Sequence, residues 1–588
     1  MYELLEQEQE DPAFKLGTDF YQMLLDTDTR AASGFGRRIT ALADAVMACT
    51  TIEEFADVIS GSPEAILFSP FLTFYVEADL KDSSTNVLYL YRPSFFLPDP
   101  DQYKSPTELS DRYTDAERTC CEKLLVLYGM SQEDAAATMD RCFEMEALIA
   151  AGCRPLSARY QTDYQESIYN PTPVSQLEQE MTAFPLMKTL EQLGVETDTI
   201  IVYEPESLRC LDTLFTQEDL EGLKAYYMAH LLRQATDFAS PEAEDAAIEA
   251  SNAENGSTGR LSDRERAYTT ANKALSELYG YMYGKTFFGD EAKADVENMI
   301  HELIEVYDRR LANADWLSEE TREYARKKLT TMEIRAGYPD ALDDWWYTLD
   351  ASGETCAADM AVYLYVESFK YSLQKIGQTV DRSEWPMTAN TVNACYTATD
   401  NSITFPAAIL QAPLYSASYS REQNLGGIGA VIGHEISHAF DTNTGSKYDA
   451  YGNMVNWWTE EDAAAFAERS KKVEDRYSSI EALPGEYVHG DLTIGETVAD
   501  LGGVAATLDL MAEIEDADYD AYFRQYASIW VGLETKEFLS NLLLTNPHAP
   551  GYLRADITVQ QFEEFYETYD IPEGSAMYTA PEDRLKVW

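Results

Sequence analysis

Two histidines lie four residues apart in an apolar, glycine-containing stretch of this 588-residue chain. The stretch Gly426–Asp441 reads GGIGAVIGHEISHAFD, which predicts a buried helix that its neighbours approach closely. Residues i and i+4 share one helix face, so the imidazoles of His434 and His438 can bind a single metal ion. Glu435 follows the first histidine and is placed to hold a water on that ion.

The alternative for this motif is a helix without a metal, in which the two histidines cap or pair with other groups. The chain has only six histidines, so a chance HExxH pattern is expected in on the order of one in a thousand chains of this composition. Burying two unpaired histidines and a glutamate in an apolar helix would also be costly. The sequence therefore favours a zinc site.

Zinc at a hydrolytic site takes three protein ligands and leaves one position open for water. Glu496, in LTIGETVADLGG (Leu492–Gly503), is the candidate third ligand. Asp500 lies on the same helix face and could accept the free N–H of a ligand histidine. The alternative is that both are ordinary acidic residues near a helix start, where the helix dipole favours them. Asp441, three residues after His438, either orients that histidine or is a solvated helix end, and the sequence leaves both open.

The charge balance excludes several kinds of partner. The chain carries 103 acidic and 44 basic residues, a formal net charge of −59. Such a surface repels phosphates and anionic lipids, so nucleic acids and membrane surfaces are not expected as partners. The sequence contains no run of 18 or more apolar residues, so no membrane span is predicted. The eight cysteines include no CxxC pair, which argues against thiol-bound zinc and against a disulfide-stapled scaffold.

Helical periodicity dominates the first 330 or so residues, and the sequence changes character around Gly337–Asp340. Clustered Val, Leu and Tyr predict a strand at Asn86–Tyr91. The small, acidic residues of Ser240–Gly259 predict an exposed loop. Asn298–Met332 predicts two helices that are separated near Asn313–Ser318. The expected fold class is mainly α, with a small mixed α/β part in the C-terminal third.

Six segments are distinctive when they are taken together. They are VNACY (Val392–Tyr396), ITFPAAILQAPLY (Ile403–Tyr415), GGIGAVIGHEISHAFD (Gly426–Asp441), GETVADLGG (Gly495–Gly503), NPHAPGYLR (Asn546–Arg554) and the terminal VW (Val587–Trp588). Together they resemble the neprilysin and endothelin-converting-enzyme family of zinc endopeptidases (gluzincins), in its bacterial type. The resemblance is strong over about Trp385–Trp588 and weaker toward the N-terminus.

This resemblance implies a zinc centre with assigned roles. His434, His438 and Glu496 match the zinc ligands of the family. Glu435 matches its catalytic glutamate, which takes a proton from the attacking water and passes it to the leaving amine. Asp500 matches the aspartate that supports a ligand histidine. One zinc ion per chain is expected.

The resemblance also implies substrate contacts. His548 matches a histidine that stabilises the transition state, although most histidines in such Pro-flanked loops are merely exposed. Arg554 matches an arginine that anchors the substrate backbone. Asn393 and Ala394 match an edge-strand pair that hydrogen-bonds an extended peptide, although Asn393 alone could be an ordinary turn residue. The apolar pocket for the residue after the scissile bond is matched by Val431, Ile529 and Trp530, with Ile409 beside them.

Two departures from the family pattern bear on location. We do not find the Asp-Phe-Tyr…Asn…Trp segment with which family members begin, so we expect that the sequence starts late and lacks any signal segment. The protein would then be extracellular or in the cell envelope, and otherwise cytoplasmic. Leu585 and Val531 stand where animal members have cysteines, so their extracellular disulfides are not expected.

The sequence thus predicts a two-lobed zinc endopeptidase, with a large helical covering lobe at 1–375 and a thermolysin-like catalytic lobe at 376–588. It would cut short peptides on the amino side of large hydrophobic residues. One alternative is a catalytically silent peptide-binding or scaffolding protein, which predicts damage to an essential position that we do not see. Another is a zinc hydrolase of non-peptide amides, which would lack Asn393 and Arg554. Nothing in the sequence indicates the natural peptide or the oligomeric state.

Overall fold

The computed structural model describes residues 1–161, 163–441 and 444–587, so Trp588 of the terminal VW pair lies outside the described residues. The chain forms two compact units. The helical unit comprises 1–79, 84–278 and 343–380, and the site unit comprises 80–83, 279–342 and 381–588. Both units are discontinuous in sequence. The division into lobes at 1–375 and 376–588 stays a prediction.

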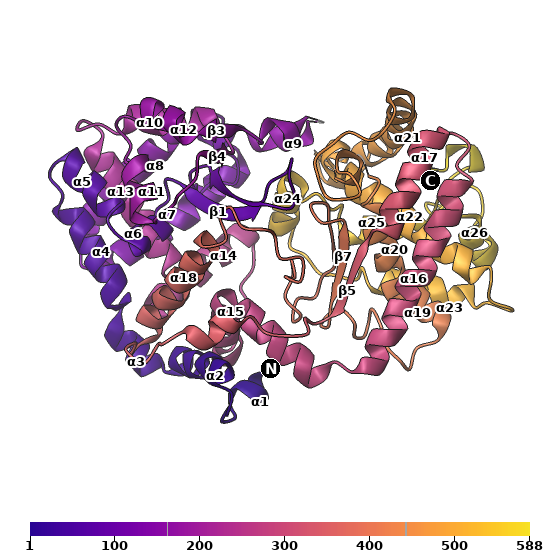
Figure 1. The fold of residues 1–588 in the computed structure, drawn as a ribbon, viewed down its shortest axis with the longest axis horizontal. Coiled ribbons are helices and arrows are strands. Elements are labelled where there is room, and N and C mark those ends of the chain that lie inside the picture. Colours follow the sequence, from indigo (N-terminus) through magenta and orange to yellow (C-terminus); the bar gives the residue numbers. More distant parts are fainter. Residues whose placement is uncertain (162, 442–443, 588) are drawn as a thin grey trace. The chain divides into compact units, whose positions relative to one another are not determined.

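The helical unit contains one small sheet among many helices (Figure 1). Its strands are β1 (Thr73–Ala78), β2 (Asn86–Tyr91), β3 (Pro171–Pro173) and β4 (Thr199–Val202), in the order β1-β2-β4-β3. The predicted strand Asn86–Tyr91 is confirmed. Its helices are α1 (Tyr2–Leu5), α2 (Pro12–Leu25), α3 (Thr27–Ser33), α4 (Gly36–Ala48), α5 (Ile52–Ile59), α6 (Pro63–Leu67), α7 (Glu108–Tyr128), α8 (Gln132–Ala150), α9 (Tyr164–Ser167), α10 (Val174–Glu180), α11 (Leu186–Gln192), α12 (Pro205–Leu214), α13 (Leu220–Gln234), α14 (Pro241–Asn255), α18 (Ala357–Leu373) and most of α15 (Asp263–Phe287).

The prediction of an exposed loop at Ser240–Gly259 is wrong, because most of this segment is helix α14. The Ser240 side chain caps the helix by accepting from the Ala243 N–H, and Pro241 occupies the first helical position. Gly256 ends the helix with a φ of 61°, the left-handed conformation that favours glycine. Four of the five alanines of α14 are buried, and the helix packs against α7. Small side chains allow close helix packing. Because small residues are also common in loops, the composition of this segment predicted a loop.

The site unit combines helices with a three-stranded sheet. Its strands are β5 (Glu333–Gly337), β6 (Cys395–Thr397) and β7 (Ser402–Pro406), in the order β5-β7-β6, and a separate hairpin of β8 (Glu481–Leu483) and β9 (Glu486–Tyr487). β5 pairs with β7 in parallel, and β6 pairs with β7 antiparallel. Besides the end of α15, its helices are α16 (Asp290–Ala312), α17 (Glu319–Thr330), α19 (Arg421–Asn424), α20 (Ala430–Ser437), α21 (Glu460–Ser478), α22 (Gly490–Met511), α23 (Tyr519–Ser528), α24 (Lys536–Thr545), α25 (Gly551–Val559) and α26 (Glu563–Tyr569).

The site unit confirms two helix predictions. α16 ends at Ala312 and α17 begins at Glu319, as the predicted break near Asn313–Ser318 requires. The predicted helix Gly426–Asp441 is present as a π-helical turn at Leu425–Gly429 followed by α20, which ends at Ser437, four residues earlier than predicted. Its apolar side chains join one core with those of α16, which explains why 279–342 belongs to this unit.

Helices α20 and α22 touch through their backbones. A Cβ on Gly433 would lie 2.8 Å from Gly503 Cα, and one on Gly503 would lie 2.4 Å from the Ala430 oxygen. Glycine is therefore required on both sides of this contact. From α16, the Tyr307 hydroxyl donates to the Gly433 oxygen at 2.7 Å. Figure 1 shows these three helices beside one another, and this packing fixes the distance between the residues that α20 and α22 carry.

Candidate metal centre and active site

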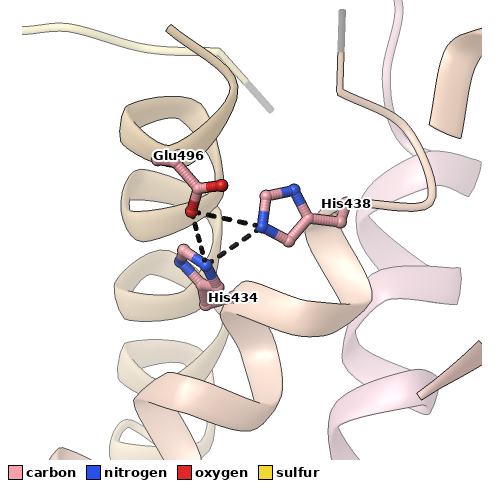
Figure 2. Close-up of side chains that lie close together, drawn as sticks. All are labelled: His434, His438 and Glu496. Carbon is pink, nitrogen blue, oxygen red and sulfur yellow. Dashed lines mark hydrogen bonds and ion pairs between the residues drawn. The ribbon is translucent and has the colours of Figure 1, made fainter. Parts of the chain in front are cut away.

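Three predicted ligands point at one another from two helices (Figure 2). His434 lies on α20, His438 directly follows that helix, and Glu496 lies on α22. The Nε2 atoms of the two histidines are 3.0 Å apart. Glu496 Oε2 lies 3.2 Å from Nε2 of His434 and 3.5 Å from Nε2 of His438. The three side chains thus present two nitrogens and one oxygen to a common point.

Two aspartates hold the other nitrogen of each ring. Asp500 Oδ1 is 2.8 Å from Nδ1 of His434, and Asp441 Oδ2 is 2.5 Å from Nδ1 of His438. Because a carboxylate only accepts, each Nδ1 carries the hydrogen and each Nε2 turns a lone pair toward the common point. For Asp441, which the sequence left open, the structure supports the orienting role over a solvated helix end, since the residue is fully buried.

The convergence of lone pairs fits a bound cation. Three imidazole nitrogens lie within 3.5 Å of Glu496 Oε2, yet none is oriented to donate a hydrogen bond to this buried oxygen. Buried acceptors without donors are destabilising unless a positive group lies among them. Two histidines and one carboxylate are a usual zinc set at a catalytic site. These residues therefore fit zinc.

Without a metal, the same carboxylates favour protons on the histidines. Burial lowers the pKa of His438, but Glu496 and Asp441 outweigh it and leave that pKa well above its ordinary value. For His434, burial is likewise outweighed by the neighbouring carboxylates of Asp500 and Glu496, so its pKa is raised. Burial raises the pKa of Asp500, but Arg554 and His434 outweigh it and lower that pKa to about 2. Asp500 thus stays an acceptor throughout the neutral range.

We therefore expect zinc binding to weaken as the pH falls from 8 to 6 and to release protons. A raised histidine pKa means that the metal-free chain keeps its protons up to a higher pH, and zinc needs the unprotonated nitrogen. Calorimetry in buffers of different ionisation enthalpy would measure the number of protons released. A zinc affinity that stays constant over this range would contradict the expectation.

Two further predicted residues, His548 and Arg554, lie next to the three ligands. His548 lies in the loop between α24 and α25, with its Nε2 3.0 Å from Glu496 Oε2. The Asn546 side-chain oxygen accepts from the His548 backbone N–H at 2.8 Å and lies 3.0 Å from its Nδ1. Arg554, on α25, donates to Asp500 through Nε at 2.8 Å and Nη2 at 2.7 Å. Its guanidinium also lies 3.9 Å from the ring centre of Trp530.

A cavity of about 450 Å³ contains every site residue that the sequence predicted. The ligands, Glu435 and Asp500 lie beside His548 and Arg554, and the segment of Asn393 and Ala394 leads into edge strand β6. The roles of these residues stay predictions, whereas their shared location is observed. The apolar lining predicted from the resemblance is present as Val431, Ile529, Trp530 and Ile409.

The cavity also has lining residues that the sequence did not indicate. Most are apolar or small, so no chemical pattern distinguishes them from core residues; they are Met387, Val392, Cys395, Tyr396, Leu414, Ala430, Thr444 and Tyr526. Asp441 lies outside this lining, and its spacing of three residues from His438 had already indicated it as a candidate. Cys395 is no ready nucleophile, since burial raises the pKa of its thiol to about 11.

Facing helices that carry two histidines and a glutamate, with a second glutamate and a sheet edge in the same cavity, define a zinc metallopeptidase. Residues 1–339 and 393–585 match two family models that are both described as peptidase family M13. The chain belongs to this family. Among the described residues, no helix is long and apolar enough to cross a membrane.

Relatives from bacteria and mammals resemble the chain over most of its length. It is 34% identical over 520 residues to a neutral endopeptidase of Lactobacillus helveticus, covering 88% of this chain and 79% of the relative. Endothelin-converting enzyme 1 of Mus musculus is 29% identical, with 91% of this chain and 72% of the relative covered. The crystal structure of PepO from Lactobacillus rhamnosis matches with a TM-score of 0.92 and 28% identity, covering 99% of this chain and 91% of that one. The two-lobed, mainly helical fold predicted from the sequence is thus confirmed.

Proposed function

We propose that this zinc endopeptidase cuts short peptides on the amino side of large hydrophobic residues, with one zinc ion per chain. The observation that carries the proposal is the shared cavity. Val431, Ile529 and Trp530 line the same space as the metal centre. An apolar wall beside the reacting groups favours a substrate residue that is large and apolar. A volume of about 450 Å³ accommodates only a few substrate residues.

The proposed chemistry gives each of these residues one role, and their shared location in the cavity supports it. Zinc, when bound by His434, His438 and Glu496, supplies a Lewis acid that makes water a stronger nucleophile at neutral pH. Glu435 takes the proton of the attacking water and delivers it to the leaving amine. His548 donates to the oxygen that becomes negative in the transition state. Asp500 and Asp441 keep the two ligand imidazoles in one tautomer and orientation.

The substrate backbone is held on both sides of the scissile bond. β6 is an edge strand, so an extended peptide can pair with the Asn393–Ala394 segment that precedes it. Nε and Nη2 of Arg554 are engaged by Asp500, so a substrate carbonyl would accept from Nη1. The rival scaffolding role has no support here, because each residue that this chemistry needs is in place.

Digestion of a mixed peptide library tests this specificity. Mass-spectrometric mapping should place most cuts immediately before Phe, Leu, Ile or other large apolar residues. One surplus methylene in an apolar pocket is worth about 1–3 kcal/mol of discrimination, so the preference should be clear. Cuts mainly before Asp, Glu or Lys would contradict the assignment of Val431, Ile529 and Trp530 to this pocket. Zinc-dependent cleavage with another preference would contradict the pocket assignment but would still support the metal centre.

A further inference from the structure

A fully buried lysine, which does not line the cavity, lies against the segment that follows the metal ligand His438. Lys328 belongs to α17, and its side chain is completely inaccessible to solvent. Burial lowers its pKa to about 7, partly offset by Asp441 and Asp449. A lysine is rarely buried without specific partners, because removing its charge from water is costly. We therefore expect its contacts to contribute to the structure of the site.

All three donors of this ammonium end on backbone oxygens. Lys328 Nζ donates to the oxygens of Ala439 at 2.9 Å, Gly445 at 2.8 Å and Tyr448 at 2.8 Å. Nζ also lies 5.4 Å from the ring centre of Trp457. Since an ammonium has three N–H groups, this set satisfies it completely. The carbonyls all belong to the segment that begins directly after His438.

That segment carries the aspartate that orients the second ligand. Asp441 lies between Ala439 and Gly445, the first two residues that Lys328 binds. Its Oδ2 is 2.5 Å from Nδ1 of His438, and its Oδ1 accepts from the Thr444 N–H at 2.6 Å. Gly445 itself is at backbone contact with the ligand, because a Cβ there would lie 2.1 Å from the His438 oxygen. A displacement of Gly445 would therefore reach His438 directly.

Lys328 also connects to the strand beside the cavity. Its backbone oxygen accepts from Asn401 Nδ2 at 3.0 Å, and Asn401 Oδ1 accepts from the Tyr396 hydroxyl at 3.0 Å. Tyr396 lies on edge strand β6, two residues after Ala394. One residue thus joins the segment behind His438 to the strand proposed to hold the peptide.

We propose that Lys328 is a positioning residue for the metal centre: its ammonium holds the backbone of Ala439, Gly445 and Tyr448, so that Asp441 keeps the His438 imidazole aimed at the metal. The inference rests on the zinc-binding role of His438. It goes beyond the ligand set because Lys328 acts only through backbone carbonyls and contacts neither metal nor substrate.

Metal affinity tests this role independently of turnover. Lys328→Met removes the three donors and keeps most of the length of the unbranched side chain. We expect the zinc dissociation constant to rise about 10–100-fold, the range seen when a group that supports a metal ligand is lost. In the Co²⁺-substituted protein, the visible d–d absorption should change, because it reports the arrangement of the ligands. Lys327→Met is the matched control, since this neighbouring lysine lies over the rings of Tyr324 and Tyr451, and it should leave both readouts unchanged.

A double-mutant cycle separates positioning from general destabilisation. In an Asp441→Asn background, Lys328→Met should weaken zinc binding much less than it does in the wild type, because both act through His438.

Purely additive effects on zinc affinity, or a folded Lys328→Met protein with wild-type zinc affinity and Co²⁺ spectrum, would overturn the proposal. If Lys328→Met does not fold, Trp457→Phe decides, because it keeps an aromatic ring but removes the Nε1 donor to the Gly445 oxygen, and it leaves the three Lys328 donors in place. About 2–5-fold weaker zinc binding would then support the proposal, and unchanged binding would overturn it. Zinc binding by the wild-type protein is a separate test: a wild type that binds no zinc would contradict the metal centre, whatever the Lys328 variants show.

Discussion

Glu435→Gln is expected to lower kcat by about 10²–10⁴-fold while zinc stays bound, the range that a positioned proton-transfer group contributes. Glutamine has almost the same shape but cannot take a proton from the attacking water. The ligand atoms belong to other residues, so metal content should be near that of the wild type. Steady-state kinetics on one apolar-site peptide, together with metal analysis of the same sample, would measure both quantities.

A matched substitution guards against unspecific effects in this comparison. Glu468 is an exposed glutamate on α21, and Glu468→Gln makes the same chemical change away from the cavity. It should retain full kcat. Near-normal kcat in Glu435→Gln would show that another group takes the proton.

His548→Ala is expected to lower kcat by about 10²–10³-fold with little change in KM, a loss of roughly 2.7–4 kcal/mol of transition-state stabilisation. The oxyanion exists only in the transition state, so a donor aimed at it adds little to substrate binding. The position of Nε2, 3.0 Å from a ligand oxygen, places the ring beside the reacting centre. Full kinetic curves over substrate concentration would separate the two constants.

His301→Ala provides the control for this variant, because His301 is an exposed histidine on α16. It should behave as the wild type. An increase in KM at unchanged kcat in His548→Ala would assign His548 to binding rather than to the oxyanion, and the catalytic case would then depend on zinc and Glu435.

Arg554 is a less direct probe of substrate binding than its match to the family pattern implies. Its guanidinium makes two hydrogen bonds to Asp500, which in turn holds Nδ1 of His434. Truncating Arg554 would leave a buried carboxylate without its cation, and such losses are strongly destabilising. A change in KM would therefore be mixed with a disturbance of the metal centre.

The metal centre could be predicted because its geometry is local. The spacing of His434 and His438 fixes a shared helix face wherever that helix lies, and Glu496 and Asp500 obey the same rule on α22. The fold class followed from periodicity in the same way. The alanine-rich α14 was missed because small residues occur both in loops and at close helix contacts, and only the packing against α7 distinguishes the two.

Other features depend on contacts between distant segments. Lys328 reads in the sequence as one of two adjacent lysines, and nothing local indicates that three carbonyls from 439–448 surround it. The discontinuous units have the same origin, because 279–342 joins the site unit through side chains that pack against residues far along the chain. The apolar lining of the cavity could be assigned only through the family resemblance.

The backbone contact between α20 and α22 affects how the protein can handle metal ions. Because glycine lets the two helices meet, the separation of the backbone positions that carry the ligands is set when the chain folds. The electrostatic cost of bringing three lone pairs together is then included in the free energy of folding. An arriving ion finds an ordered chelating site and loses little of its binding free energy to ordering the protein. Choice among metals at such a site depends on coordination geometry and on supply.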